Sequence, residues 1–110
     1  MRATTCSTQI TFHGLRPNEE LKREVDERIT WLEQFFPPLL GCRVRLQVPH
    51  RHHSHGRHMH VTIEMTVPRH PRLVVTHEPS LDDARVAIRE AFDAARRRLQ
   101  DFAGEKLAPR

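Results

Sequence analysis

Alternating and helically spaced hydrophobic residues divide this chain into six expected elements, the first of which is a short strand at 9–13. Ile10 and Phe12 lie on one face of that strand and polar residues lie on the other, which is the period of two that a strand requires. Gly14 follows directly and is typical of a strand end. The first element is therefore expected to be a half-buried strand.

The next segment has the period of an α-helix. Asn18 is a favourable N-cap, and Glu19 and Glu20 suit the positive end of a helix dipole. Pro37 and Pro38 stop the helix, because proline lacks the backbone N–H that a helix interior uses. The apolar residues between these limits form one stripe. They are Leu21, Val25, Ile29, Leu32 and Phe36.

Three more strands are expected in the middle of the chain. Residues 42–48 alternate between apolar and polar side chains, and residues 59–67 hold the same period for longer. Residues 72–76 form a further short strand after a proline-flanked turn. The intervening segment 49–58 is polar, rich in histidine and contains a glycine, so it is expected to be a hairpin loop.

The last pattern predicts a long amphipathic helix. Ser80 and Asp83 have the spacing of a capping box at its start. Arg85, Arg89 and Arg96 fall within about 40° of one another at helical pitch, on the shoulder of the apolar face. A solvated helix surface with ion pairs along the helix explains such arginines as well as a binding role does. The apolar face contains Leu81, Ala84, Ile88, Ala91, Phe92, Ala95, Leu99 and Phe102.

The order strand, helix, three strands, helix predicts an α+β fold, βαβββα, with a four-stranded mixed sheet. Each helix has one apolar stripe, so both helices are expected on one face of the sheet. A helical crossover lets the first two strands run parallel, and the following strands should form an antiparallel meander. The other sheet face is polar, mildly basic and without Phe, Tyr or Trp, so it would stack bases poorly. It consists of Thr11, Arg43, Arg45, Gln47, His60, Thr62, Glu64 and Thr66.

Charge changes this picture, because the basic excess lies in one segment. Lys and Arg number 18 against 14 Asp and Glu. Residues 42–75 contain six arginines, one acid (Glu64) and seven of the nine histidines, whereas the flanking segments are close to neutral. A basic segment between two balanced ones indicates a surface for a polyanion, and nucleic acid is the leading partner.

Length and cysteine content set further limits. A chain of 110 residues with 37% hydrophobic residues is expected to be one domain with a modest core. We expect flexible ends at 1–8 and 104–110. The N-terminal residues lack the apolar region of a signal peptide, and no apolar run is long enough to span a membrane. Cys6 and Cys42 are far apart in sequence, which favours reduced thiols in a cytoplasmic protein.

The clustered histidines admit several readings. Imidazoles can bind a transition metal, and His53, His55, His58 and His60 are the candidate ligands, but the neighbourhood has no cysteine or paired carboxylates. A solvated loop, or an RNA contact that gains charge as the pH falls, explains them too. An oligomerisation module that uses a sheet edge is a further alternative. The sequence has no catalytic triad or phosphate-binding loop, so it does not indicate an enzyme.

Several short motifs in a fixed order resemble the ribosome hibernation-promoting factor family, also called ribosome-associated inhibitor A or protein Y, in its short form. The resemblance covers residues 9–99. The order and spacing of these motifs are more specific to the family than any single motif is. The motifs are Gln9–Gly14, Asn18–Leu21, Trp31–Phe35, Val61–Pro68, Leu73–Val75, and Asp83 through Ala87 and Ile88 to Asp93 and Arg97–Leu99.

This resemblance implies a fold similar to double-stranded RNA-binding domains and a non-enzymatic protein. It implies binding to the small ribosomal subunit and its RNA, where the protein blocks the channel for messenger and transfer RNA. In that family basic residues of the last helix and nearby loops contact RNA, which favours Arg97 and its neighbour Arg98. The sequence departs from the family at Arg85, where a tyrosine is common, and at Ala94 and Asp101, where basic residues are common.

The sequence therefore predicts a single ribosome-binding domain that is a monomer when free. It predicts no cofactor, no metal site, no small-molecule substrate and no membrane contact. The family contacts favour the arginines of the last helix over those of the sheet. The candidate RNA-binding residues are Arg85, Arg89, Arg96, Arg97, Arg98, Arg43, Arg45 and Arg69.

Overall fold

A computed structural model describes residues 6–48, 59–77 and 84–107. It has one four-stranded sheet and two helices in the expected order βαβββα, so the predicted fold class is confirmed. The elements are β1 (Ser7–His13), α1 (Glu19–Phe35), β2 (Gly41–Gln47), β3 (His60–Val67), β4 (His70–His77) and α2 (Ala84–Leu107).

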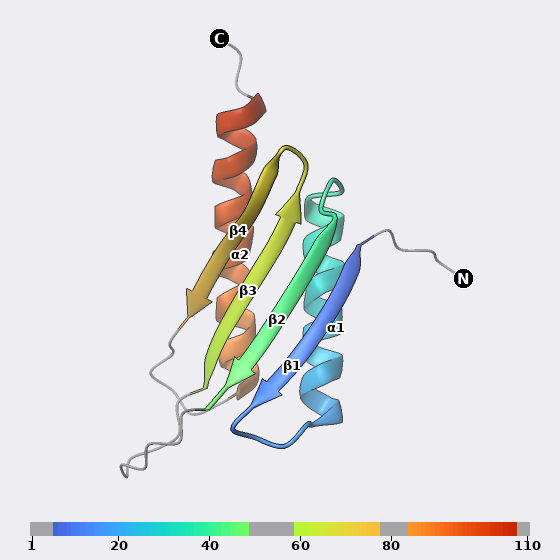
Figure 1. Cartoon of the computed structure of the whole chain (residues 1–110), viewed down its shortest axis with the longest axis vertical. Helices are drawn as coiled ribbons and strands as arrows, with labels where there is room; N and C mark the ends of the chain where they lie inside the picture. Colours follow the sequence, from blue (N-terminus) through green and yellow to red (C-terminus); the bar gives the residue numbers. More distant parts are fainter. Residues whose placement is uncertain (1–5, 49–58, 78–83, 108–110) are drawn as a thin grey trace, which may run out of the picture.

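The strands lie in the sheet in sequence order, β1-β2-β3-β4 (Figure 1). β1 and β2 are parallel, because α1 returns the chain to the end of the sheet at which β1 begins, so β2 runs in the same direction. The pairs β2–β3 and β3–β4 are antiparallel, as the sequence predicts for a meander. Ile63 pairs with Val44 on one side and Val75 on the other, so the apolar positions of three strands fall on the same face.

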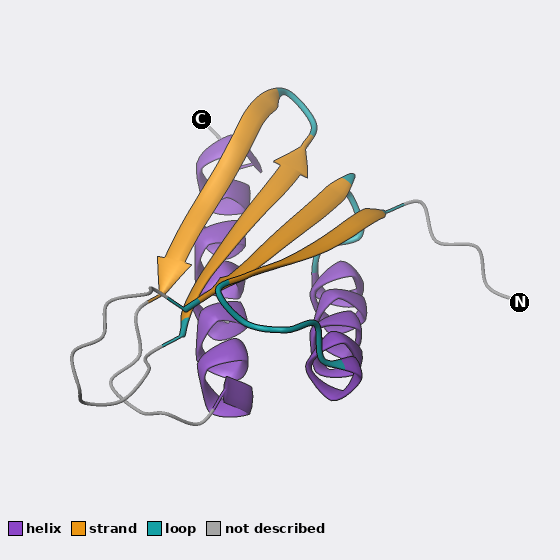
Figure 2. Ribbon diagram, turned by 60° about the horizontal axis from the view of Figure 1, so that its bottom comes forward, coloured by secondary structure: helices purple, strands orange, loops and turns teal. Residues whose placement is uncertain are grey.

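Both helices cover this apolar face and leave the other face open (Figure 2). Ile63, Ile88 and Phe92 are fully buried in one core cluster, in agreement with the predicted strand register. The apolar stripe of α1 joins the same cluster through Leu21, Val25, Ile29 and Leu32. A shift of β3 by one residue would turn this set of side chains to solvent, so burial fixes the register.

Local signals explain where β1 ends and α1 begins. The Asn18 side chain accepts hydrogen bonds from the backbone N–H groups of Glu20 and Leu21, at 2.8 and 3.1 Å. Asn18 is thus the N-cap that the sequence predicts. Gly14 has a φ of +79°, and a Cβ atom there would lie 2.1 Å from the carbonyl oxygen of Val48. Glycine is required at this point because the chain turns with a positive φ directly beside another backbone segment.

The regular elements extend beyond the predicted boundaries at both ends. β1 begins at Ser7 and α2 continues to Leu107, so residues 7–8 and 104–107, for which the sequence predicts flexibility, lie in a strand and a helix. The predicted hairpin loop at 49–58 and the capping box of Ser80 and Asp83 lie outside the described residues. Neither helix among the described residues combines the length and apolar character that crossing a bilayer requires.

Candidate nucleic-acid interface

The open sheet face is a grid of mostly polar side chains set by strand alternation, with Val74 as an exposed apolar member. Every second residue of each strand points away from the helices, and the strand pairing aligns these residues in rows across the sheet. The central row contains Gln9, Arg43, Glu64 and Val74, and the next contains Thr11, Arg45, Thr62 and Thr76. The predicted composition of this face is therefore confirmed.

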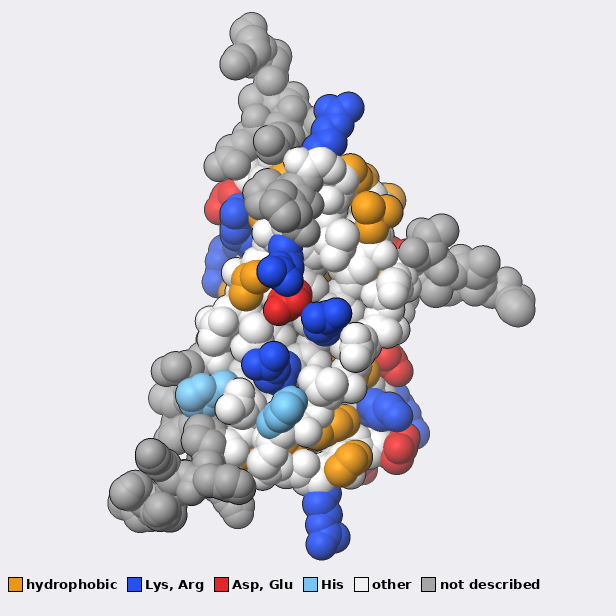
Figure 3. Space-filling model, viewed as in Figure 1, with side chains coloured by type: hydrophobic (Ala, Val, Ile, Leu, Met, Phe, Trp, Pro, Cys, Tyr) orange, Lys and Arg blue, Asp and Glu red, His pale blue; other side chains and the backbone are white. Residues whose placement is uncertain are grey.

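The basic side chains of this face surround one acid. The Arg43 Nη1 and Arg72 Nη1 atoms each lie 3.6 Å from Oε1 of Glu64. Figure 3 shows these basic side chains gathered around the carboxylate in the middle of the face. Arg45 lies in the neighbouring row and forms no ion pair with any described residue. We refer to Glu64, Arg43 and Arg72 together as the Glu64 cluster.

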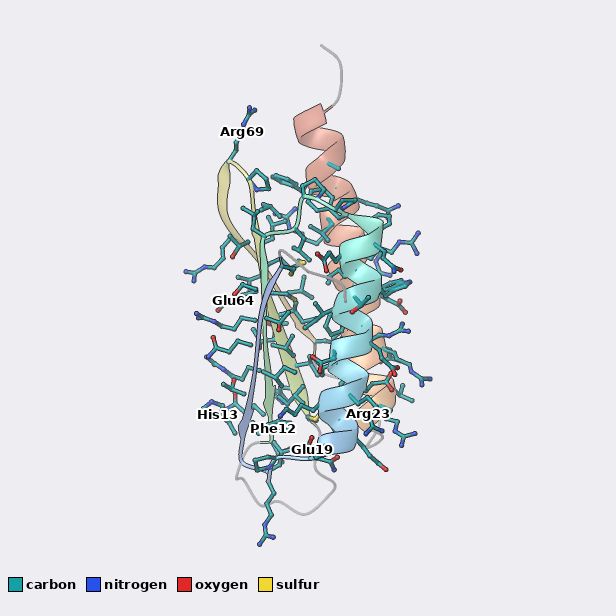
Figure 4. All side chains as sticks on the ribbon, turned by 90° about the vertical axis from the view of Figure 1, so that its right-hand side faces the viewer. Phe12, His13, Glu19, Arg23, Glu64 and Arg69 are labelled. Atoms are coloured by element: carbon teal, nitrogen blue, oxygen red, sulfur yellow. The ribbon has the colours of Figure 1, made fainter. Side chains whose placement is uncertain are left out.

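Two adjoining hollows open beside this cluster. The larger, of about 410 Å³, is lined by Arg43, Glu64 and Arg72, together with polar atoms of β1 and β2. The smaller, of about 280 Å³, shares Arg43 and Glu64 and extends to Arg45 and His13. Figure 4 shows from the side that Glu64 and His13 lie on the sheet surface opposite the helices. The arrangement gives a concave, hydrogen-bonding and cationic surface without an enclosed ligand cavity.

Two predicted RNA-binding arginines of α2 instead bridge the two helices. Arg85 Nη2 donates to Glu20 Oε1 at 3.3 Å, and Arg89 Nε donates to Glu24 Oε2 at 3.0 Å. The sequence suggests ion pairs between residues of the same helix. The two arginines instead pair with acids of α1, because the shoulder of α2 faces that helix. Both arginines therefore take part in ion pairs that hold the two helices together.

Arg96 also faces α1, where it lies over two aromatic rings. Its guanidinium carbon is 4.7 Å from the ring centroid of Phe35 and 5.7 Å from that of Trp31. Arg28 approaches the Trp31 ring as well, at 5.1 Å. Such cation–π contacts are worth roughly 0.5–1 kcal/mol at exposed sites. This arginine thus contributes to the helix interface.

Arg97 and Arg98 lie elsewhere on α2. Arg97 is exposed, and Asp93 and Asp101 stand four residues before and after it, on neighbouring turns. Arg98 is half-buried. Acidic neighbours lower the positive potential at Arg97, so the helix position that the family resemblance favours is locally close to neutral.

The two layers of the fold differ in charge. The two helices together contain nine basic and ten acidic side chains, whereas the strands and the turn at 68–69 contain four arginines and one acid. The described part of the basic excess in residues 42–75 therefore belongs to the sheet layer. A polyanion that approaches the described part of the chain meets net positive charge on the sheet side.

Arg69 extends this basic surface at the turn between β3 and β4. It has a φ of +66°, a conformation that costs a residue with a side chain about 1–2 kcal/mol. Its side chain points away from the end of the sheet (Figure 4). Glycine would suit this backbone better, so Arg69 occupies the turn against its conformational preference.

Arg69→Gly is expected to raise the thermal midpoint and to weaken RNA binding. Relief of the positive φ stabilises the fold by up to about 1 kcal/mol after allowance for the larger entropy of an unfolded glycine. Loss of one phosphate contact lowers the log–log salt slope by about 0.7–0.9. Calorimetry and RNA titration measure the two effects, and a variant that gains stability with undiminished binding would remove Arg69 from the interface.

The described histidines occupy separate positions. His13 and His60 are on the open face at the same end of the sheet, each paired in register with Gln47. His77 Nε2 lies 2.9 Å from Glu90 Oε1 and links β4 to α2. Within the described ranges no three histidine, cysteine or acidic side chains form a group that could hold a metal. The candidate ligands His53, His55 and His58 lie outside those ranges.

The two cysteines are free and buried where β1 and β2 begin. Burial raises the pKa of Cys6 to about 11, with a further contribution from the negative charge of Glu33. Burial also raises the pKa of Cys42 to about 12, with a smaller contribution from Cys6. Both side chains are therefore protonated thiols at neutral pH and poor nucleophiles.

One contributor to this surface is absent from the predicted RNA-binding residues. Arg72 approaches Glu64 from β4, on the opposite side from Arg43. Arg72 lies on the open face because its neighbour Leu73 is buried on the helix side of the sheet. The sequence does not show this orientation, since Leu73, Val74 and Val75 are all apolar and do not alternate with polar residues.

Comparisons with known proteins identify the family of this chain and solved structures with a similar fold. Residues 8–106 match the family model described as "Sigma 54 modulation protein / S30EA ribosomal protein". No curated protein matches the sequence. A ribosomal subunit interface protein from Coxiella burnetii has a similar structure, with a TM-score of 0.74 and 10% identity over 89% of this chain and 98% of that chain. The N-terminal domain of Thermus thermophilus Protein Y gives 0.68 and 17% identity, over 86% and 94%. At these identities the structural likeness shows the fold alone.

Proposed function

The chain belongs to the Sigma 54 modulation protein / S30EA ribosomal protein family, and from this membership we propose that it is a cytoplasmic, ribosome-associated translation inhibitor. The observation that carries the proposal is the family match over residues 8–106, which spans all six elements of the fold. The resemblance to ribosome hibernation-promoting factors that the motifs indicate is thereby confirmed. The specific partner in the proposal is the small ribosomal subunit with its RNA.

The charge distribution supports an RNA partner. The open face presents arginines among threonine and glutamine side chains, which can donate hydrogen bonds to phosphate oxygens and to ribose hydroxyls. Among the described residues it presents no Phe, Tyr or Trp ring on which a base could stack. Recognition of folded RNA by backbone and shape, rather than by base sequence, follows from this composition.

The proposed mechanism is steric and involves no chemical step. A small folded domain that occupies the RNA-walled channel of the small subunit excludes messenger and transfer RNA from the same space. The domain thereby silences idle ribosomes during stress. Affinity arises from arginine–phosphate contacts, so binding should be reversible and strongly dependent on salt.

Competition with transfer RNA tests the mechanism. The domain is expected to inhibit translation in a reconstituted system in proportion to the fraction of ribosomes that it occupies. Prior loading of ribosomes with messenger and transfer RNA should reduce binding of the domain, because the two occupy one space. Simultaneous, undiminished binding of the domain and transfer RNA would contradict the steric mechanism even if the domain binds ribosomes.

A further inference from the structure

We infer that Glu64 is an internal competitor for RNA: its carboxylate occupies the two arginines of the Glu64 cluster until an RNA phosphate takes its place. The inference rests on the proposed function in one respect, namely that the RNA is that of the small ribosomal subunit. It adds a binding surface, the open sheet face, and a residue that lowers affinity there.

Glu64 lies between Arg43 and Arg72, whose side chains are exposed enough to move. Glu64 is on β3, and its side chain is 26% exposed. Arg43 on β2 and Arg72 on β4 flank it, with side chains 60% and 57% exposed. The acid is thus the more enclosed partner, while both guanidinium groups reach solvent. A phosphate that enters the larger hollow meets the two arginines from the side where they are open.

The contacts within the cluster are loose enough to exchange. The distance of 3.6 Å from each guanidinium nitrogen to Oε1 exceeds the roughly 2.7–2.9 Å of a charge-assisted hydrogen bond. Ion pairs between exposed side chains contribute little to stability. Each guanidinium has five N–H donors in a planar fork, and a phosphate group can accept two of them in parallel. Exchange of the carboxylate for phosphate therefore costs little and forms better hydrogen bonds.

Glu64 opposes this exchange in two ways. It neutralises part of the charge that attracts the phosphate, and after exchange its carboxylate stays close to the bound anion. An acid in the middle of a binding surface weakens every RNA complex by the same repulsion. Only an RNA whose shape also engages Arg45 and the surrounding hydrogen-bonding residues retains useful affinity. Glu64 thus lowers the affinity of folded and unrelated RNA by the same factor, and only the RNA that makes the additional contacts stays bound at working concentrations.

The test compares Glu64→Gln with Glu24→Gln. Both variants lose one negative charge, and with it two ion pairs at Glu64 and one at Glu24, which is on the helix layer and pairs with Arg89. The probes are purified small ribosomal subunits and an RNA duplex of about 16 base pairs with unrelated sequence. Glu64→Gln is expected to tighten binding of both probes by about three- to tenfold at low salt. It should also steepen the salt slope by up to about 0.7–0.9. Glu24→Gln should change binding less than twofold.

A double-mutant cycle separates competition from a structural effect. In an Arg43→Gln, Arg72→Gln background the Glu64→Gln change should tighten binding much less, because the arginines it releases are absent and only its repulsion of the bound anion is relieved. Equal gains for Glu64→Gln and Glu24→Gln would overturn the inference and show an effect of total charge. An undiminished gain in the double background would overturn it too. If the natural chain binds the duplex but not the subunits, the proposed function fails, and the cycle on the duplex still decides the role of Glu64. No binding of either probe overturns both.

Discussion

Ile63→Ala is expected to lower the free energy of unfolding by about 2–5 kcal/mol, the largest effect of any single substitution considered for this fold. Ile63 is at the centre of β3 with 0% of its surface exposed. Val44 and Val75 flank it in register, and Ile88 and Phe92 of α2 are buried in the same cluster. Removal of three carbons leaves a cavity that strands and helix cannot close without moving together.

Thr62→Ala is the matched control, because Thr62 is the preceding residue of the same strand and lies on the open face. Its substitution should cost well under 1 kcal/mol, as expected for a surface position. Trp31 is the only tryptophan in the chain, so its fluorescence can follow unfolding in urea without a label. Equal losses at the two positions would show that the strand register is wrong by one residue.

Replacement of Arg43 and Arg45 by glutamine is expected to weaken binding to small subunits strongly. Arg43 and Arg45 are two residues apart on β2, so both side chains project from the open face of the sheet. If each contacts a phosphate, the pair of changes should lower the log–log salt slope by about 1.4–1.8. Because both side chains project from the open face, the thermal midpoint should change little. Titration of the variant over a series of salt concentrations measures the slope.

The matched helix variant is Arg85→Gln with Arg89→Gln. It removes the same charge, but these arginines pair with Glu20 and Glu24 of α1. Its main effect should be a lower thermal midpoint, since two bridges between the helices are lost. Its binding should fall less than that of the sheet variant. The reverse ranking would return the RNA contacts to the last helix, where the family resemblance places them.

The fold could be predicted from the sequence because its elements carry strong local signals. The nine residues at 59–67 alternate between apolar and polar side chains, so only one face of that strand can point into the core. The apolar stripe from Leu21 to Leu32 likewise shows which side of α1 is buried. Asn18 and the prolines bound that helix locally, so no tertiary information is needed to place it. The helix end near Leu107 lacks such a signal, because Gly104 interrupts the apolar pattern while the backbone continues as helix.

The arrangement of the charges was harder to predict, because it depends on how the helices face each other. Helical pitch places Arg85 and Arg89 on one shoulder of α2, but it does not show that Glu20 and Glu24 of α1 stand opposite. Likewise, alternation places Arg43 on the open face, while the encounter with Arg72 at Glu64 depends on the pairing of β4 with β3. Contacts across elements therefore change which arginines are available to RNA.

Co-sedimentation of the unmodified chain with purified small ribosomal subunits tests the central claim most directly. The domain is expected to travel with the subunits at low salt and to dissociate steeply as salt rises, with a log–log slope of about 0.7–0.9 for each arginine–phosphate contact. Large subunits at the same concentration should retain much less of it. Absence of the domain from the small-subunit fraction even at low salt would contradict the proposal that this protein acts on the small ribosomal subunit.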